Sequence, residues 1–149
     1  MLLGLTAITA MAERLPTAVA ATTELEVWKS PACGCCQAWV EHLERDGFTA
    51  IVHETDDLNV VRRDLGIPAD VAGCHVARLD GYVLEGHVPD VAVRRLLRER
   101  PSIQGLSVPG MPSGSPGMEV PGVPAEAFDV IAFDRNGLRE IFLQVRPIG

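Results

Sequence analysis

Four cysteines are the residues of this sequence best suited to chemistry. Three of them crowd one short turn, Cys33, Cys35 and Cys36, and the fourth is Cys74. Thiolates are nucleophiles and soft metal ligands, and they form readily at a helix N-terminus, where free N–H groups and the helix dipole attract negative charge. Cys33 and Cys36 have the C-x-x-C spacing that closes a disulfide or shares a metal. The cysteines therefore predict metal binding or thiol redox chemistry.

A strand and a helix are expected to position this turn. Residues 24–28 alternate polar and apolar side chains like a half-buried strand, and residues 37–45 repeat apolar side chains at helical spacing. Residues 48–53 predict a second strand, and residues 56–65 predict a second helix. In a regular helix Cys35 would point away from Cys33, unless the intervening glycine lets the backbone turn it inward.

The rest of the chain predicts one more helix and four more strands. Asp80-Gly81 is typical of a tight hairpin turn between strands over residues 74–79 and 82–85, and a helix is expected over residues 90–99. The predicted fold is α/β, with the order β-α-β-α-β-β-α. A long Gly/Pro-rich loop over residues 102–124 and an appended C-terminal β-hairpin complete a single domain, residues 24–149.

The predicted order of elements places Cys74 beside the cysteine turn. If the first two strands are parallel and the third is antiparallel to them, the first strand ends where the third begins. Cys74 opens that third strand, and His87 follows the fourth strand at the same edge, which makes His87 a candidate ligand or hydrogen-bond partner of a ligand. Strand alternation would send His75 to the opposite face, so His75 is either a ligand or an ordinary histidine.

Four thiolates are compatible with zinc, an iron–sulfur cluster or reduced copper. Structural zinc sites usually have two well-separated pairs of ligands, whereas three cysteines in one turn favour sulfurs that bridge several soft ions. Met111 and Met118 lie in the Gly/Pro-rich loop. Their thioethers would select copper over zinc, although such residues also serve simply for packing. The residues favour copper and leave the other metals open.

Composition and the N-terminus indicate an exported protein that does not bind nucleic acid. The net charge of −7 argues against the basic surface that a protein needs to bind the phosphate backbone of a nucleic acid. The apolar stretch over residues 1–11 is too short to cross a bilayer, so no stable membrane insertion is expected. A small-residue cleavage site at residues 18–20 predicts a signal peptide over residues 1–20, atypical because it lacks a basic start and Glu13-Arg14 interrupts it.

The chain resembles the CopG-type periplasmic copper-resistance proteins, also known as domain of unknown function 411. The matching segments are VWKSPACGCCQAWVEHLERDGF (residues 27–48), Gly73-Cys74-His75, GHVP (residues 86–89) and PGMPSGSPGME (residues 109–119). The resemblance implies a thioredoxin-like fold, a periplasmic location and a multinuclear copper site bridged by cysteine sulfurs. All four cysteine positions match, so the resemblance implies that the copper ligands are Cys33, Cys35, Cys36 and Cys74.

The expected function is periplasmic copper binding in copper resistance, with cycling between Cu(I) and Cu(II) as a redox activity that the sequence leaves open. Its expected partners are copper ions and other periplasmic copper-handling proteins. The alternative is a thiol–disulfide oxidoreductase in which Cys33 attacks and Cys36 resolves. An exchanger needs only two sulfurs, so Cys35 and Cys74 argue against it. A purely structural disulfide framework is disfavoured, because neighbouring cysteines close loops too small to constrain the unfolded chain.

Overall fold

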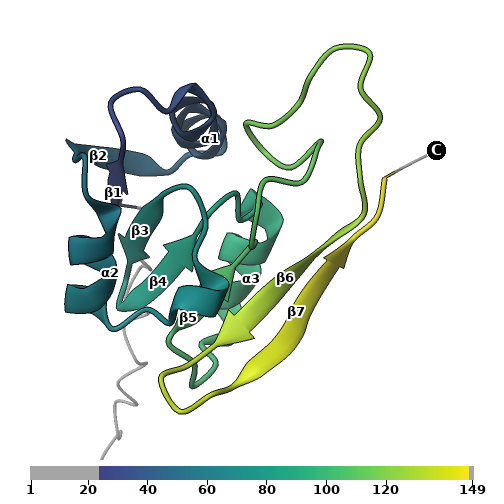
Figure 1. The fold of residues 1–149 in the computed structure, drawn as a ribbon. Helices are drawn as coiled ribbons and strands as arrows, with labels where there is room; N and C mark the ends of the chain where they lie inside the picture. The colour runs from purple at the N-terminus through teal and green to yellow at the C-terminus, as the bar shows by residue number, and fades with distance from the viewer. Residues whose placement is uncertain (1–23, 148–149) are drawn as a thin grey trace, which may run out of the picture.

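The computed structural model describes residues 24–147. These residues form an α/β fold in which a seven-stranded sheet carries helices on both faces (Figure 1). The elements in chain order are β1 (Glu24–Lys29), α1 (Gly34–Arg45), β2 (Thr49–Glu54), α2 (Leu58–Leu65), the short 3-10 helix η1 (Ala69–Val71), β3 (Val76–Leu79), β4 (Tyr82–Glu85), α3 (Asp90–Glu99), β5 (Gly105–Ser107), β6 (Phe128–Phe133) and β7 (Arg139–Val145).

The strand order is β2-β1-β3-β4-β5-β6-β7. β1 and β2 are parallel, β3 is antiparallel to β1, and β3 pairs with β4 in a hairpin. Trp28, near the end of β1, lies opposite Val76, the first residue of β3. The end of β1 and the start of β3 therefore share one edge of the sheet, as the sequence predicts, and this edge carries the cysteines.

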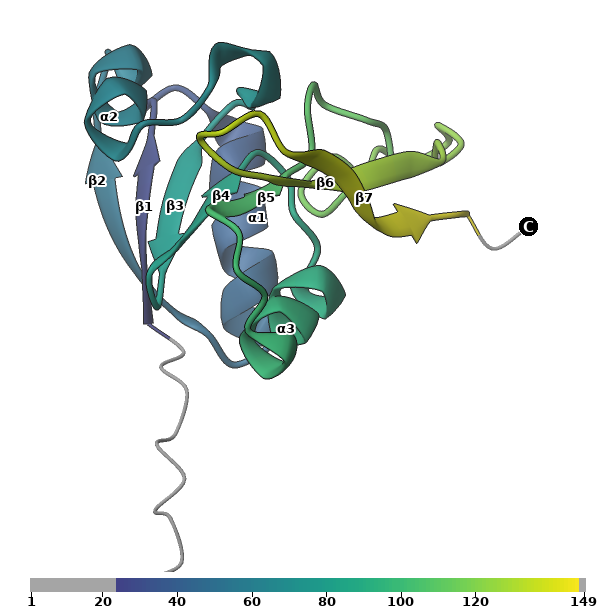
Figure 2. The ribbon, with the colours of Figure 1, turned by 90° about the horizontal axis from the view of Figure 1, so that it is seen from below.

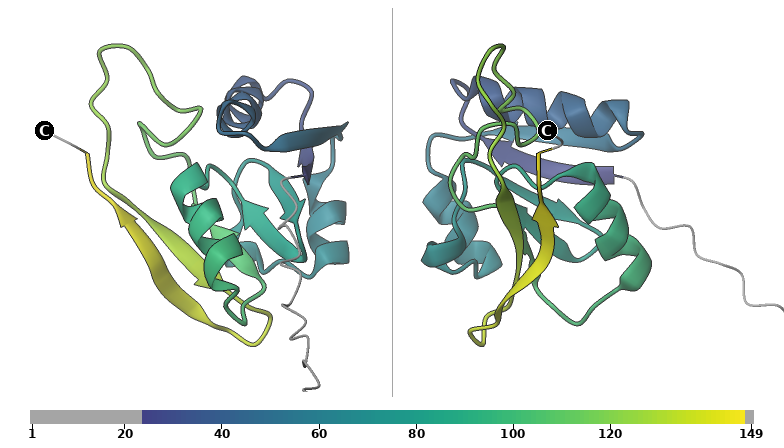
Figure 3. Two further views of the ribbon diagram at one scale, coloured as in Figure 1. Left: turned by 180° about the vertical axis from the view of Figure 1, so that it is seen from behind. Right: turned by 90° about the vertical axis from the view of Figure 1, so that its right-hand side faces the viewer.

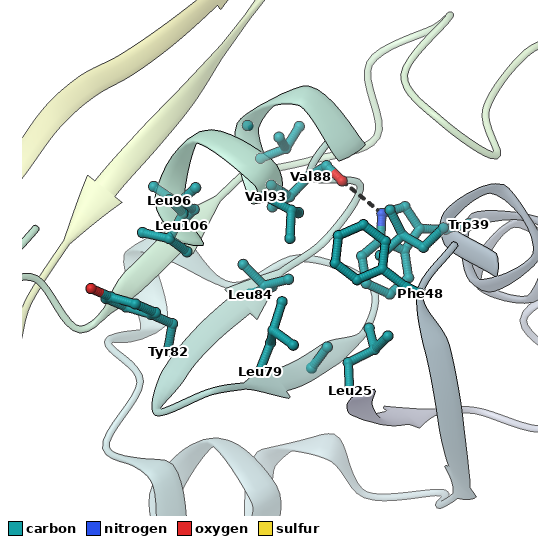
Figure 4. Packing of buried hydrophobic residues seen from close by; sticks show 14 of the residues in the cluster. Leu25, Trp39, Phe48, Leu79, Tyr82, Leu84, Val88, Val93, Leu96 and Leu106 are labelled. Atoms are coloured by element: carbon teal, nitrogen blue, oxygen red, sulfur yellow. Dashed lines mark hydrogen bonds between the residues drawn. The ribbon is translucent and has the colours of Figure 1, made fainter. Parts of the chain in front are cut away.

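The main hydrophobic core fills the space between the sheet and helices α1 and α3. Figure 2 shows these two helices on one face of the sheet and α2 on the other. Figure 4 shows the packing, in which Trp39 of α1 and Leu96 of α3 meet strand residues such as Leu25 and Leu84. Alternate residues of β1, such as Leu25 and Val27, and of β3, such as Ala77 and Leu79, face this core, as period-2 sequences require. The helix that carries the cysteines, α1, is thus held by the main hydrophobic core.

Helix α2 covers the opposite face through a smaller apolar cluster. Leu58, Val61 and Leu65 are only partly buried, and they pack against a cluster that includes Val76 and Val83. The helix begins at Asp57, whose carboxylate accepts a hydrogen bond from the Asn59 N–H, and it ends at Gly66 in the left-handed conformation. None of its residues is fully buried, so polar contacts carry part of its attachment.

Three boundaries differ from the prediction. α1 begins at Gly34, so Cys35 and Cys36 lie in its first turn, and β3 begins at Val76, so Cys74 precedes the strand. The predicted loop over residues 102–124 contains β5, which pairs with β4 and β6 and makes β6 and β7 part of the central sheet. A three-residue strand that starts with glycine has too little periodicity to be recognised in a Gly/Pro-rich stretch.

The loop between β5 and β6 rises along the sheet and approaches the start of α1 (Figure 3). A Cβ at Gly117 would lie 2.6 Å from the Cys35 carbonyl oxygen and 2.7 Å from the Trp39 nitrogen. The loop therefore touches the cysteine helix backbone to backbone. The predicted signal peptide, residues 1–20, lies outside the described residues. Within residues 24–147, no helix is long and apolar enough to cross a membrane.

Candidate functional site: a cluster of cysteines and histidines

The turn between β1 and α1 presents three cysteines at the start of the helix. The Cys33 N–H donates to the Ser30 carbonyl at 3.0 Å, which closes the turn after β1. Cys33 is the N-cap residue and has an extended backbone, with φ −82° and ψ 92°. Cys35 and Cys36 then occupy the first helical turn, where the helix dipole favours negative charge. The local fold thus places the three cysteines at the positive end of the helix dipole.

The four sulfur atoms all lie within 4.8 Å of one another. Cys33 and Cys36 form a disulfide with a Cα–Cα distance of 5.3 Å, while Cys35 and Cys74 are free thiols. The Cys35 sulfur is 3.5 Å from the Cys33 sulfur, so Cys35 does not point away from Cys33 as it would in a regular helix. The reason is that Cys33 is not yet helical, and its extended backbone returns its side chain toward the first turn.

Cys74 reaches the cluster from the segment before β3. Its sulfur lies 2.8 Å from the His87 Nε2 atom and 3.3 Å from the His75 Nδ1 atom. Burial, followed by electrostatic repulsion from the neighbouring Cys35 sulfur, raises the pKa of Cys74 to about 12. The Cys74 thiol is therefore protonated at neutral pH, and it can donate its proton to His87.

His87 is oriented by the long loop. Its Nδ1 atom lies 2.7 Å from the Pro116 carbonyl oxygen, and because a carbonyl only accepts, Nδ1 carries the proton. Nε2 then presents its lone pair to Cys74. Burial lowers the pKa of His87, against the opposing effect of the Pro116 carbonyl, and favours this neutral imidazole. Metal-binding histidines are commonly held by such a bond from the second ring nitrogen to a carbonyl.

His75 also joins the cluster, so the expectation that it faces the opposite side of the sheet was wrong. Strand alternation does not apply, because Cys74 and His75 both precede β3. The His75 ring is buried 4.3 Å from the Trp39 ring and 5.1 Å from the His87 ring. Burial, followed by the repulsion that a protonated His75 would meet from a protonated His87, lowers the pKa of His75 to about 3, which keeps it neutral. The Cys74 sulfur and the two imidazoles form a second donor set, within 4.8 Å.

The two loop methionines lie in different surroundings. Met111 is 56% exposed and lines a shallow cavity of about 200 Å³ together with Ala72, Gly73, Cys74 and Gly110. Met118 is half-buried, and its N–H donates to the Ser115 carbonyl at 2.7 Å within the loop. The structure thus brings Met111 beside Cys74, whereas Met118 stabilises a turn of the loop next to Gly117.

Sequence reasoning missed three contributors to the site. The Pro116 carbonyl orients His87, and the side chains of Arg62 and Glu85 bind the main chain of Gly73, next to Cys74. A backbone carbonyl carries no signature in a sequence. A glutamate at the end of the apolar strand Tyr82–Glu85 was a signal that could have been used, because carboxylates are rarely buried without a partner.

The donor set fits a soft metal ion. Four sulfurs and two neutral imidazoles are the ligands that Cu(I) and zinc accept, whereas hard ions such as Mg²⁺ require oxygen. The disulfide engages two of the four sulfurs, so it must be reduced before all four can bind a metal. The same site can therefore exist in a dithiol and a disulfide form, with different numbers of available ligands.

Comparisons with known proteins agree with this site. The family described as "Protein of unknown function, DUF411" matches residues 71–118. The solved structure named "Copper resistance protein copG- Form 2" is 38% identical to this chain and superposes with a TM-score of 0.77. The match covers 83% of this chain and 98% of the chain in that structure. "Copper resistance protein copG- Form 1" is 37% identical and superposes with a TM-score of 0.78. The match covers 85% of this chain and 99% of the chain in that structure. A comparison with curated proteins found no match.

Both structural relatives are covered almost over their whole length, so the likeness concerns the entire fold and not the cysteine turn alone. The cysteine segment, the Cys74 segment and the loop that holds His87 all lie within one continuous structure. At this identity and coverage, the chain belongs to the CopG family of copper-resistance proteins.

Proposed function

We propose that this protein binds copper in the periplasm as part of copper resistance, through Cys33, Cys35, Cys36 and Cys74. The observation that carries the proposal is the mutual approach of four sulfurs within 4.8 Å, in a chain related to proteins named for copper resistance. The fold is best described as thioredoxin-like with a C-terminal β-hairpin. A dithiol exchanger needs only a C-x-x-C pair at the start of its cysteine helix. Here the start of α1 belongs to a larger cluster of four cysteines.

The four cysteines act as soft ligands, and their close spacing favours sulfurs that bridge more than one copper ion. His87 presents its unprotonated Nε2 atom beside Cys74, and the His75 Nδ1 atom lies 3.3 Å from the same sulfur. Met111 stands at the cavity next to Cys74. In the proposal these residues, with Met118 in the same loop, complete the copper ligands or hold them in place.

The Cys33–Cys36 pair supplies the redox chemistry in this proposal. Conversion of its two thiols to the disulfide releases two electrons and two protons, which suffices to reduce two Cu(II) ions to Cu(I). The Cys35 and Cys74 thiols stay free in the disulfide form and can retain Cu(I). The expected exchange partners are other periplasmic copper-handling proteins, and the signal peptide expected over residues 1–20 would provide export.

Thiol–disulfide exchange is a second candidate function, favoured by the disulfide between Cys33 and Cys36 at the start of α1. In that function Cys33 attacks a substrate disulfide and Cys36 resolves the mixed disulfide. Cys35, at 3.5 Å from Cys33, would compete with Cys36 for the same step. This competition is the reason that copper binding ranks first.

Substitution Cys74→Ser tests the two functions against each other. It removes one sulfur of the cluster and leaves the Cys33–Cys36 pair intact. The reduced variant should bind fewer Cu(I) ions per chain than the reduced wild-type protein in an anaerobic titration against a Cu(I) chelator. Copper X-ray absorption should show sulfur ligands in the wild-type protein.

The control is insulin reduction by both proteins, which reports on thiol exchange at the start of α1 and does not require Cys74. An unchanged copper stoichiometry in Cys74→Ser would contradict a four-sulfur site. Efficient insulin reduction by a wild-type protein that retains no copper would establish the second function instead.

A further inference from the structure

The residue before Cys74 is bound on both sides of its backbone by one buried ion pair. The Gly73 N–H donates to the Glu85 Oε2 atom at 2.6 Å, and the Arg62 Nη2 atom donates to the Gly73 carbonyl at 2.7 Å. Arg62 also donates to both carboxylate oxygens of Glu85, at 2.9 and 3.2 Å. A guanidinium and a carboxylate thus fix the position and direction of the main chain at Gly73.

This ion pair is expensive to bury. The Glu85 side chain is 0% exposed and the Arg62 side chain is 14% exposed. Removing two charges from water costs about as much as their attraction returns, so such pairs often add little to stability compared with apolar residues. Their hydrogen bonds are directional, however, and directional bonds hold a backbone in one geometry more precisely than apolar packing does.

Packing of a side chain cannot fix the main chain at Gly73, because this position has no room for one. A Cβ at position 73 would lie 2.6 Å from both the Cα and N atoms of Gly86, because the two backbones touch. That contact places the segment of Cys74 directly against the segment that continues to His87. Polar bonds to the Gly73 peptide groups are then the means by which the fold determines where Cys74 points.

We propose that Arg62 and Glu85 are positioning residues for Cys74, and that they set the approach of its sulfur to Cys35 and His87. Neither side chain needs to touch the metal. The inference rests on the proposed copper function, and it assigns to α2 a part in the metal site. Arg62 of α2 is the link, because it lies on the face of the sheet opposite the helix that carries the other cysteines.

Arg62→Met and Glu85→Leu test the inference, with Arg62→Lys and Glu85→Gln as conservative variants. Arg139→Met is the matched control, because Arg139 also makes a two-bond pair with a carboxylate, Asp70, at 2.7 and 2.9 Å. Metal affinity typically falls about 10- to 100-fold when a residue that orients a ligand is removed. We expect such a loss of Cu(I) affinity, with a shifted sulfur-to-copper charge-transfer band, in Arg62→Met and Glu85→Leu.

Glu85→Gln keeps an oxygen for the Gly73 N–H and should recover part of the affinity, and Arg139→Met should behave as wild type. Far-UV circular dichroism and thermal unfolding of the metal-free proteins identify variants that fail to fold. If Glu85→Leu does not fold, Arg62→Met and Arg62→Lys decide. Wild-type affinity and an unchanged spectrum in a folded Arg62→Met protein would overturn the inference.

A second readout separates this inference from the copper function itself. The rate at which iodoacetamide alkylates Cys74 in the metal-free protein, followed by peptide mass spectrometry, depends on the placement of the thiol and not on copper. A faster rate in Arg62→Met than in wild type and Arg139→Met supports positioning, even if the wild-type protein binds no copper. Equal rates in all three proteins would refute positioning.

Discussion

At the scale of single residues, the site combines one thiol, that of Cys74, which its surroundings keep protonated, with two imidazoles that they keep neutral. Burial raises the pKa of Cys74 and lowers the pKa values of His75 and His87, so the three groups cluster without net charge. An uncharged cluster avoids most of the cost of burying ions. A soft cation that enters it displaces the thiol proton and supplies the positive charge that stabilises the thiolate.

The oxidation state of Cys33 and Cys36 should determine how much copper the protein holds. The disulfide form offers two of the four sulfurs, Cys35 and Cys74, whereas the reduced form offers all four. We expect fewer Cu(I) ions per chain after mild oxidation than after reduction, as measured by elemental analysis of desalted protein. A Cys33→Ala, Cys36→Ala double variant should bind the same amount under both conditions. Equal copper content in oxidised and reduced wild-type protein would contradict this expectation.

The sequence predicted which residues would come together better than it predicted the orientation of their side chains. The four cysteines and His87 were predicted to meet because the order of strands implied it, and the structure places them together. The orientation of Cys35 and His75 was not predictable from helix and strand periodicity. Both residues lie at the boundary of an element, where backbone angles depart from the regular values on which periodicity rests.

At the scale of elements, the loop between β5 and β6 binds the two parts of the site together. Its Pro116 carbonyl accepts from His87, and the next residue, Gly117, packs on the backbone of α1 at Cys35. Gly117 has φ +85°, a conformation that favours glycine. The loop therefore contacts the cysteine helix and the histidine at successive residues, so a shift of the loop would disturb both.

Gly117→Ala should displace this loop. The new Cβ would lie 2.6 Å from the Cys35 carbonyl oxygen, in addition to the roughly 1–2 kcal/mol cost of the left-handed conformation. The control is Gly122→Ala, with φ +81° and no atom within 4 Å of its Cβ, which carries the conformational cost alone.

Urea unfolding should show a larger loss of stability for Gly117→Ala than for Gly122→Ala. Hydrogen exchange should show faster exchange at Met118 in Gly117→Ala only. Equal losses in the two variants would mean that the contact with α1 contributes nothing.

At the scale of the whole molecule, β5 joins the cysteine-bearing half of the sheet to β6 and β7. It pairs parallel with β4 and antiparallel with β6, which makes the sheet continuous from β2 to β7. The sequence predicted most helices and strands from their periodicity, but it did not predict this connection. The three residues of β5 are too few to show the alternation of polar and apolar side chains that identifies a strand. Its pairing with distant strands is not visible in the local sequence.

Gly105→Ala tests that continuity. Its Cβ would lie 2.0 Å from the Val83 carbonyl oxygen, so β5 can approach β4 only with glycine at this position. We expect a loss of stability of roughly 1–3 kcal/mol, typical of overpacking, in urea unfolding followed by circular dichroism. Trp28 lies in β1 and Trp39 in α1, both in the half of the molecule that carries the cysteines. Their fluorescence should report the same lowered midpoint of urea unfolding. A fluorescence transition left at the wild-type midpoint would show that the two halves unfold independently.

The contact between Gly73 and Gly86 also limits how this protein can change in evolution. Each residue stands beside one member of the Cys74–His87 pair. A side chain at Gly73 would press against the Gly86 backbone and push the sulfur and the imidazole apart, and a side chain at Gly86 would collide with the Val108 carbonyl oxygen at 2.6 Å. The two glycines should therefore be inherited as a unit with the cysteine and the histidine. A descendant that replaced one of them would have to give up this arrangement of donors.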